Sequence, residues 1–164
     1  MTGPPEQPRR LTHVDDAGHA RMVDVSAKDV TVREATARGR VLCSPEVVGA
    51  LRGAGVPKGD ALVVARIAGI QAAKRTPDLV PLAHPVAVHA VRVSLHVVDD
   101  GVDIEATVRT ADRTGVEMEA LTSVSVSALA LVDMVKALDR HTRITDVRVV
   151  AKSGGRSGDW RAEP

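Results

Sequence analysis

Two carboxylates and an acid–lysine pair lie within one stretch of this sequence, Thr114–Lys136, and their spacing favours proton-transfer chemistry. Glu117 and Glu119 are two residues apart, so an extended backbone would direct both carboxylates to one face. Such carboxylates suit hydrogen bonds to an amine-bearing ring. Asp133 and Lys136 are three residues apart and share one side of a predicted helix, an arrangement that suits general acid–base catalysis.

Each pair also has a simpler explanation. An aspartate and a lysine three residues apart most often form an exposed ion pair worth about 0.2–0.5 kcal/mol, and two carboxylates on one strand face are most often solvated. The helix predicted from Ser123 to about Arg140 favours a functional role for the Asp133–Lys136 pair. Val126 and Leu129 lie on the side of this helix that carries Asp133, so that side is apolar as well as charged. A helix that is apolar nearly all round is normally buried on both sides. We therefore expect this side to face a pocket or another subunit.

Three cations from distant parts of the chain, Lys58, Lys152 and Arg156, suit the phosphates of a nucleotide-like substrate. Lys58 lies in a Pro-Lys-Gly-Asp turn, and the other two lie in a glycine- and serine-rich loop that lacks the Walker A pattern. A plain turn lysine and a flexible tail explain these residues equally well. With the acidic residues, they predict acid–base chemistry on a charged nucleotide-like substrate.

The histidines do not predict a metal site. His84 and His89 are five residues apart, His13 and His19 are six apart, and neither spacing matches a zinc motif. We expect neither a metal nor an organic cofactor. Two prolines bracket His84, so the backbone that carries it should be stiff and non-helical.

Composition narrows the class of protein. The 164 residues carry a net charge of +1, which is too balanced to predict binding to nucleic acid or to a membrane surface. With Cys43 as its only cysteine, the chain cannot form an internal disulfide, and we expect a soluble cytoplasmic protein with no membrane span. An RNA-binding domain would need aromatic residues on its central strands, but the chain has no Phe or Tyr. A nucleotide-binding regulatory module without chemistry remains an alternative.

The elements that must position these residues are predicted from local patterns. Alternation predicts strands, Ser44 and Asp60 are expected to cap two helices, and Asp99-Asp100-Gly101 predicts a hairpin turn. The order gives an α+β, ferredoxin-like βαββαβ sandwich, with an antiparallel sheet and helices packed on one face. We expect a flexible N-terminal arm at residues 1–10 and one domain at residues 11–160. The expected elements are strands at 31–43 (interrupted at Gly39), 91–97, 102–108 and about 147–149, helices at 45–53 and 61–75, and a flexible basic tail at 152–160.

Several sequence blocks occur in a specific order from Leu11 to Trp160. The most specific are Pro81–Pro85, Arg113–Thr122, Asp133–Lys136 and Lys152–Gly155. Together these blocks resemble the MoaC family, the cyclic pyranopterin monophosphate synthases of molybdenum cofactor biosynthesis.

The resemblance implies a lyase that converts (8S)-3′,8-cyclo-7,8-dihydroguanosine 5′-triphosphate to cyclic pyranopterin monophosphate and diphosphate. It implies a homohexamer, a trimer of dimers, with the active site between subunits, and no nucleic-acid or membrane partner. By motif position, Asp133 corresponds to the catalytic acid/base and Lys136 to its close partner. The substrate-binding positions implied in the same way are Asp24, Arg33, Lys58, Leu82, Ala83, His84, Glu117, Met118, Glu119 and Lys152.

The chain departs from the family pattern at three positions. Ala83 stands where the family usually has cysteine, so a thiol at that position is not needed if this chain is active. Val132 and Val135 replace a usual tyrosine and cysteine around Asp133 and keep an apolar character. The charged set is intact, which favours the enzyme interpretation.

Overall fold

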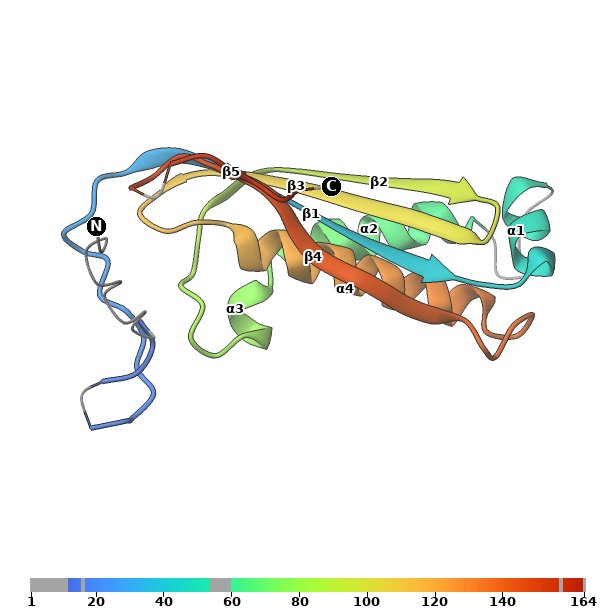
Figure 1. Cartoon of the computed structure of the whole chain (residues 1–164), viewed down its shortest axis with the longest axis horizontal. Helices are drawn as coiled ribbons and strands as arrows, with labels where there is room; N and C mark the ends of the chain where they lie inside the picture. Colours follow the sequence, from blue (N-terminus) through green and yellow to red (C-terminus); the bar gives the residue numbers. More distant parts are fainter. Residues whose placement is uncertain (1–11, 16, 54–59, 157, 164) are drawn as a thin grey trace, which may run out of the picture.

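A five-stranded antiparallel sheet with helices on one face forms the body of the protein (Figure 1). The computed structural model describes residues 12–15, 17–53, 60–156 and 158–163. The predicted arm at residues 1–10 and Lys58 lie outside these ranges. The elements are β1 (Thr31–Leu42), α1 (Pro45–Arg52), α2 (Ala61–Ala73), α3 (Thr76–Leu79), β2 (Val88–Val98), β3 (Gly101–Asp112), α4 (Glu117–Val135), β4 (Arg143–Ser153) and β5 (Trp160–Arg161).

The strand order confirms the predicted ferredoxin-like α+β class. It runs β2-β3-β1-β4-β5, so β1 lies between β3 and β4 and pairs antiparallel with both. Side chains alternate along β1 as expected for a half-covered sheet. Ala35, Ala37 and Val41 are buried under the helices, whereas Arg38 is exposed on the other face.

Close packing of α2 and α4 fixes the helical layer above the sheet. A Cβ on Gly69 of α2 would collide with Ser127 Oγ of α4, so only glycine allows the two helices to approach this closely. Gly39 acts similarly in β1, because a Cβ there would lie 2.7 Å from a methyl group of Val124. Gly39 therefore makes room for α4. The sequence predicted an interruption of the strand here; β1 continues through Gly39, but its pairing with β4 shifts register between Arg38 and Arg40.

The predicted helix caps are confirmed. The Ser44 hydroxyl accepts a hydrogen bond from the Val47 amide at 3.4 Å, and Asp60 Oδ1 accepts one from the Val63 amide at 3.0 Å. Each cap satisfies an amide that has no partner within the first turn of its helix.

Three predictions near the site were wrong. Glu117–Glu119 are not extended, because α4 begins at Glu117 rather than at Ser123. The helix also ends at Val135 rather than near Arg140. Glutamate and methionine favour helices, and carboxylates are stabilised at the positive N-terminal end. The tail is not simply a loop, because Trp160–Arg161 pairs with β4 as β5.

Helix α4 bears on the expectation that the chain has no membrane span. Within the described ranges it is one helix that is long and apolar enough to cross a membrane, by length and composition only. Half of that window is buried inside the protein, where α4 packs against α2 and the sheet. A buried core helix has the same apolar character.

Candidate active site

A small charged cavity opens where the start of α4 meets the ends of β1 and β4. Its volume is about 140 Å³, and its lining includes Arg33, Glu117 and Lys152. Lys152 Nζ lies 3.3 Å from Glu117 Oε1, and both side chains are about 70 % shielded from solvent. The cavity therefore combines carboxylate acceptors with cationic donors, as recognition of a phosphorylated heterocycle requires.

Arg33 is held in place by its neighbours. Its Nε donates a hydrogen bond to the Asp112 carbonyl at 2.9 Å. Above it runs the Gly154–Gly155 turn, in which both residues have positive φ, at 84° and 74°. A Cβ on Gly155 would collide with the Arg33 guanidinium, so this position requires glycine for both backbone conformation and space.

His84 contacts the segment that precedes β1. Its Nε2 lies 2.6 Å from the Val23 carbonyl, a distance that implies that this nitrogen carries the proton. The adjacent Asp24 carboxylate accepts a hydrogen bond from the Ser26 amide at 2.9 Å. Hydrogen bonds from Ser26 are the main reason that the pKa of Asp24 is lowered, and His84 contributes to the same direction. Leu82 and Ala83 are half-buried in the same loop.

Glu119 lies in the first turn of α4, two residues from the cavity-lining Glu117, and is buried, with only 3 % of its surface exposed. Burial away from water raises its pKa to about 7, and the nearby Glu117 charge acts in the same direction. A carboxyl that titrates near neutral pH can both give and accept a proton under working conditions. Such a pKa is a frequent property of functional residues.

Asp133 and Lys136 lie at the other end of α4. Lys136 Nζ donates a hydrogen bond to Asp133 Oδ1 at 2.6 Å, and 59 % of the Asp133 side chain is exposed. At 1.5 Å per helical residue, Asp133 is about 24 Å from Glu117 along the helix axis. The side of α4 that carries the pair is exposed in one copy, so the predicted two-sided burial is not met within a single chain.

The structure thus divides the predicted site residues into two groups. Figure 1 shows the loop between α3 and β2 at the same end of the sheet as the start of α4. That end carries Asp24, Arg33, Leu82, Ala83, His84, Glu117, Met118, Glu119 and Lys152. The opposite end carries Asp133 and Lys136. We did not anticipate Lys28, whose carbonyl accepts a hydrogen bond from Arg113 Nε at 2.9 Å. The segment around Lys28 has no clean periodicity that could have indicated this contact.

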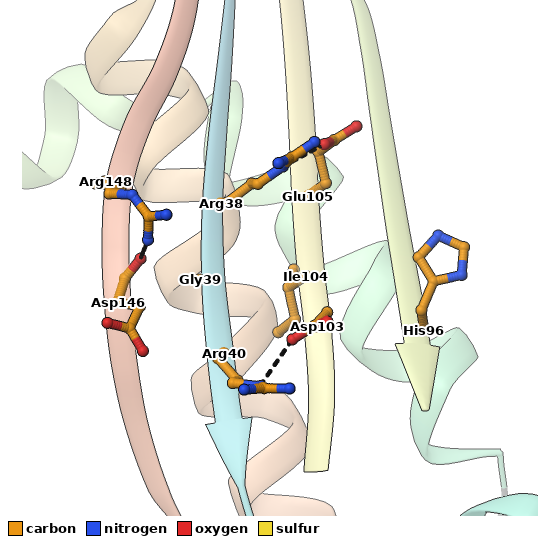
Figure 2. Close-up of a pocket in the computed structure, with 9 residues that line it drawn as sticks. All are labelled: Arg38, Gly39, Arg40, His96, Asp103, Ile104, Glu105, Asp146 and Arg148. Atoms are coloured by element: carbon orange, nitrogen blue, oxygen red, sulfur yellow. Dashed lines mark hydrogen bonds and ion pairs between the residues drawn. The ribbon is translucent and has the colours of Figure 1, made fainter. Parts of the chain in front are cut away.

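A larger hollow, of about 550 Å³, lies on the face of the sheet away from the helices (Figure 2). Two of its three arginines are matched by acids: Arg38 Nε lies 2.7 Å from Glu105 Oε2, and Arg40 Nε lies 2.9 Å from Asp103 Oδ1. The third, Arg148, donates a hydrogen bond to the Asp146 carbonyl at 3.2 Å. A phosphate would have to compete with these carboxylates, as it would with Glu117 for Lys152 in the smaller cavity. The smaller cavity beside α4 is the better candidate because it brings together predicted site residues from three elements, Arg33, Glu117 and Lys152.

In the described part of the chain, no three His, Cys, Asp or Glu side chains are grouped so as to hold a metal ion. The candidate site instead offers proton-transfer groups and fixed charges. These groups suit acid–base chemistry on an anionic substrate.

Comparison with known proteins gives a consistent result. The model of the MoaC family matches residues 22–155. Proteins named cyclic pyranopterin monophosphate synthase resemble the chain over most of their length. The one from Streptomyces coelicolor is 70 % identical over 92 % of this chain and 89 % of its own. The one from Streptomyces avermitilis is 68 % identical over 96 % and 92 %. The one from Parvibaculum lavamentivorans is 54 % identical over 94 % and 98 %.

Proposed function

This chain belongs to the MoaC family, and we propose that it carries out the family's reaction at a site that two copies of the chain complete together. Its activity is that of a cyclic pyranopterin monophosphate synthase, a lyase of molybdenum cofactor biosynthesis. The substrate is the cyclised GTP derivative 3′,8-cyclo-7,8-dihydro-GTP. During the reaction a substrate hydroxyl oxygen bonds to the α-phosphorus and its proton passes to a base. The bond to the bridging oxygen breaks, and diphosphate leaves with the electron pair.

The observation that carries the proposal is the charged cavity beside α4, with Glu117, Lys152 and Arg33 in its lining. In this proposal Glu117 and Glu119 accept hydrogen bonds from the amine groups of the substrate ring. Lys152 and Arg33 bind its phosphates and stabilise the negative charge that develops as diphosphate leaves. Glu119, with a pKa of about 7, exchanges a proton with the ring.

The loop before β2 forms the other wall of the proposed site. Leu82 and Ala83 present their backbone to the substrate, and His84 is oriented by the Val23 carbonyl. Asp24 and Met118 complete the contacts on the same copy. Family position adds Lys58, which lies outside the described residues, as a further phosphate-binding cation.

The catalytic Asp133–Lys136 pair is supplied by a second copy. The exposed side of α4 and its neighbour α2 is apolar as well as charged: Leu129 is 58 % exposed and Ile67 is 55 % exposed. Exposed apolar patches of this kind mark protein–protein interfaces. Val126 lies about midway between Met118 and Asp133 along α4. A two-fold axis near Val126 would bring Asp133 of one copy opposite Met118 of the other.

Such a dimer holds two equivalent sites and is the unit that a homohexamer, a trimer of dimers, would repeat. Within each site Asp133 and Lys136 move protons during ring opening and pterin formation. Residues 11–160 form the catalytic domain in this proposal, and the enzyme acts in the cytoplasm on a small-molecule substrate. It requires neither a metal nor an organic cofactor.

Incubation of the purified protein with the cyclised GTP derivative tests the function directly. We expect stoichiometric release of diphosphate together with formation of a pyranopterin, detected after oxidation by its fluorescence. A regulatory nucleotide-binding module would bind the same compound and release no diphosphate. Binding without diphosphate release would contradict the proposed catalysis and would leave the cavity beside α4 as a nucleotide-binding site.

A further inference from the structure

A β-bulge interrupts the pairing of β2 with β3 where β2 begins and β3 ends. Val88 lies opposite Thr110 and Ala90 lies opposite Arg109, so His89 is one extra residue on β2. Bulges disrupt the backbone pairing locally and are frequent next to active sites. The contacts that hold the two strand ends together at this bulge therefore bear on the site.

Three hydrogen bonds that involve side chains span the bulge, and we call them the β2–β3 clamp. Thr110 Oγ1 donates to the Ala87 carbonyl at 2.6 Å. The Ala87 amide donates to Asp112 Oδ2 at 3.4 Å. The Ala111 amide donates to His89 Nδ1 at 3.3 Å, so this ring nitrogen carries no proton and acts as the acceptor.

The clamp connects two parts of the proposed site. On one side, Ala87 follows His84 by three residues in the loop before β2. On the other side, the Asp112 carbonyl accepts a hydrogen bond from Arg33 Nε at 2.9 Å. We propose that His89 is a positioning residue, which acts through the clamp to hold Arg33 and the His84 loop at a fixed separation. The inference rests on the proposed function for the substrate that these groups bind.

The location of His89 favours a role in positioning over a role in the core. Its side chain is exposed at the bulge, so its replacement removes no core packing. The amide that it holds belongs to the residue before Asp112, whose carbonyl holds Arg33. A site whose groups must be ordered when the ligand arrives binds that ligand more weakly. Loss of the clamp should therefore weaken substrate binding more than it weakens the fold.

Three substitutions separate the acceptor atom of His89 from the size of its side chain. Asparagine places its Oδ1 near the position of Nδ1, whereas His89→Leu keeps the bulk without an acceptor and His89→Ala removes both. We expect kcat/KM for the cyclised GTP derivative to fall about five- to tenfold in His89→Leu and His89→Ala, because one hydrogen bond is lost. His89→Asn should stay within about twofold of wild type, although asparagine is disfavoured in strands.

The matched control is His96→Ala, because His96 is an exposed histidine of the same strand that lines the hollow on the open face of the sheet. It should leave kcat/KM unchanged. Hydrogen exchange of the Ala111 amide, followed by NMR in the full-length protein, reports the bond to His89 directly. Exchange should be faster in His89→Leu and His89→Ala than in wild type or His89→Asn.

The outcomes separate this inference from the proposed function. Lower kcat/KM in His89→Leu and His89→Ala, with recovery in His89→Asn, supports it. If wild type binds the cyclised GTP derivative without converting it, the proposed reaction fails, and the same order of variants in the dissociation constant still supports positioning by His89.

Two results overturn the inference even if turnover by wild type is normal. One is normal affinity and kcat/KM in His89→Leu despite faster exchange of the Ala111 amide, which would make the clamp merely structural. The other is an equal loss in His89→Asn or His96→Ala. A wild-type protein that neither binds nor converts the compound overturns both the inference and the proposed function.

Discussion

Glu117 and Asp133 stand at opposite ends of α4, about 24 Å apart along one helix. Glu117 belongs to a cavity with Lys152 and Arg33, whereas Asp133 is exposed beside Lys136. No substrate the size of a nucleotide bridges that distance within one copy. For both residues to act on one substrate, as proposed, a second copy must bring the two ends together.

Asp133→Asn should abolish most of the activity and leave the fold intact. The side chain is largely exposed, so its charge contributes little to stability, but a neutral amide cannot exchange protons. We expect diphosphate release to fall by at least about a hundredfold, with an unchanged melting temperature. Asp146→Asn, the same chemical change on the opposite face of the sheet, should retain full activity. A folded Asp133→Asn protein with normal turnover would remove this aspartate from the mechanism.

Two variants that are each inactive should give active protein when they are co-expressed, provided that their substitutions affect opposite ends of α4. Co-expression of Asp133→Asn with Lys152→Met gives mixed dimers in which one of the two shared sites carries neither substitution. With random pairing we expect about a quarter of wild-type activity.

The control for this experiment combines two substitutions at the same end. Glu117→Gln co-expressed with Lys152→Met leaves every shared site damaged, so activity should stay low. Equal recovery in both mixtures, or none in either, would contradict a site built from two copies.

Stability should depend on pH through Glu119. Its pKa is raised in the folded state from 4.5 to about 7, so the folded protein binds this proton more tightly than the unfolded chain. Its contribution is therefore fully present below pH 4.5 and is lost as the pH rises toward 7, by about 3 kcal/mol.

Glu119→Gln mimics the protonated acid and should remove this dependence. We expect the variant to unfold at higher urea concentration than wild type at pH 8 and at a similar concentration at pH 5. Glu34→Gln, a change at an exposed carboxylate of β1, provides the comparison. The quantity to compare is the free energy of unfolding of the wild type minus that of Glu119→Gln. If this difference does not fall between pH 5 and pH 8, the raised pKa is contradicted.

Gly155→Ala should impair substrate binding more than it impairs stability. The new methyl group would displace the Arg33 guanidinium, so KM should rise by about tenfold or more. Gly158 is the matched control, because it also has positive φ, at 65°, but has open space around its Cβ direction. Both alanine variants should lose about 1 kcal/mol from the strained backbone, and only Gly155→Ala should lose affinity. Equal KM values would indicate that Arg33 does not bind substrate.

Local chemistry explains which parts of the fold could be predicted. The helices that follow Ser44 and Asp60 could be predicted because each begins with a side-chain cap, and a cap depends on only a few adjacent residues. Glu117 and Glu119 suggested a strand because they alternate with apolar neighbours, but helix propensity and the positive helix end decided their conformation.

The site was harder to predict because its members meet only through tertiary structure. Lys152 was predicted from the sequence as a phosphate-binding cation, and the family resemblance added Arg33, but the sequence did not reveal that Lys28 lines a neighbouring cavity. Lys28 is positioned by a side chain 85 residues away, Arg113. Glu117 and Asp133 lie at opposite ends of α4 because that helix begins at Glu117. The sequence did not predict this start, because the Glu-Met-Glu alternation indicated a strand.

The short pairing of β5 with β4 gives the protein a built-in optical probe. Trp160, the only tryptophan of the chain, is the cross-strand neighbour of Lys152, and no other indole contributes to the emission. A ligand that draws the Lys152 ammonium away from Glu117 changes the electric field around the ring. Occupancy of the cavity should therefore be readable from intrinsic fluorescence in real time, with no label attached.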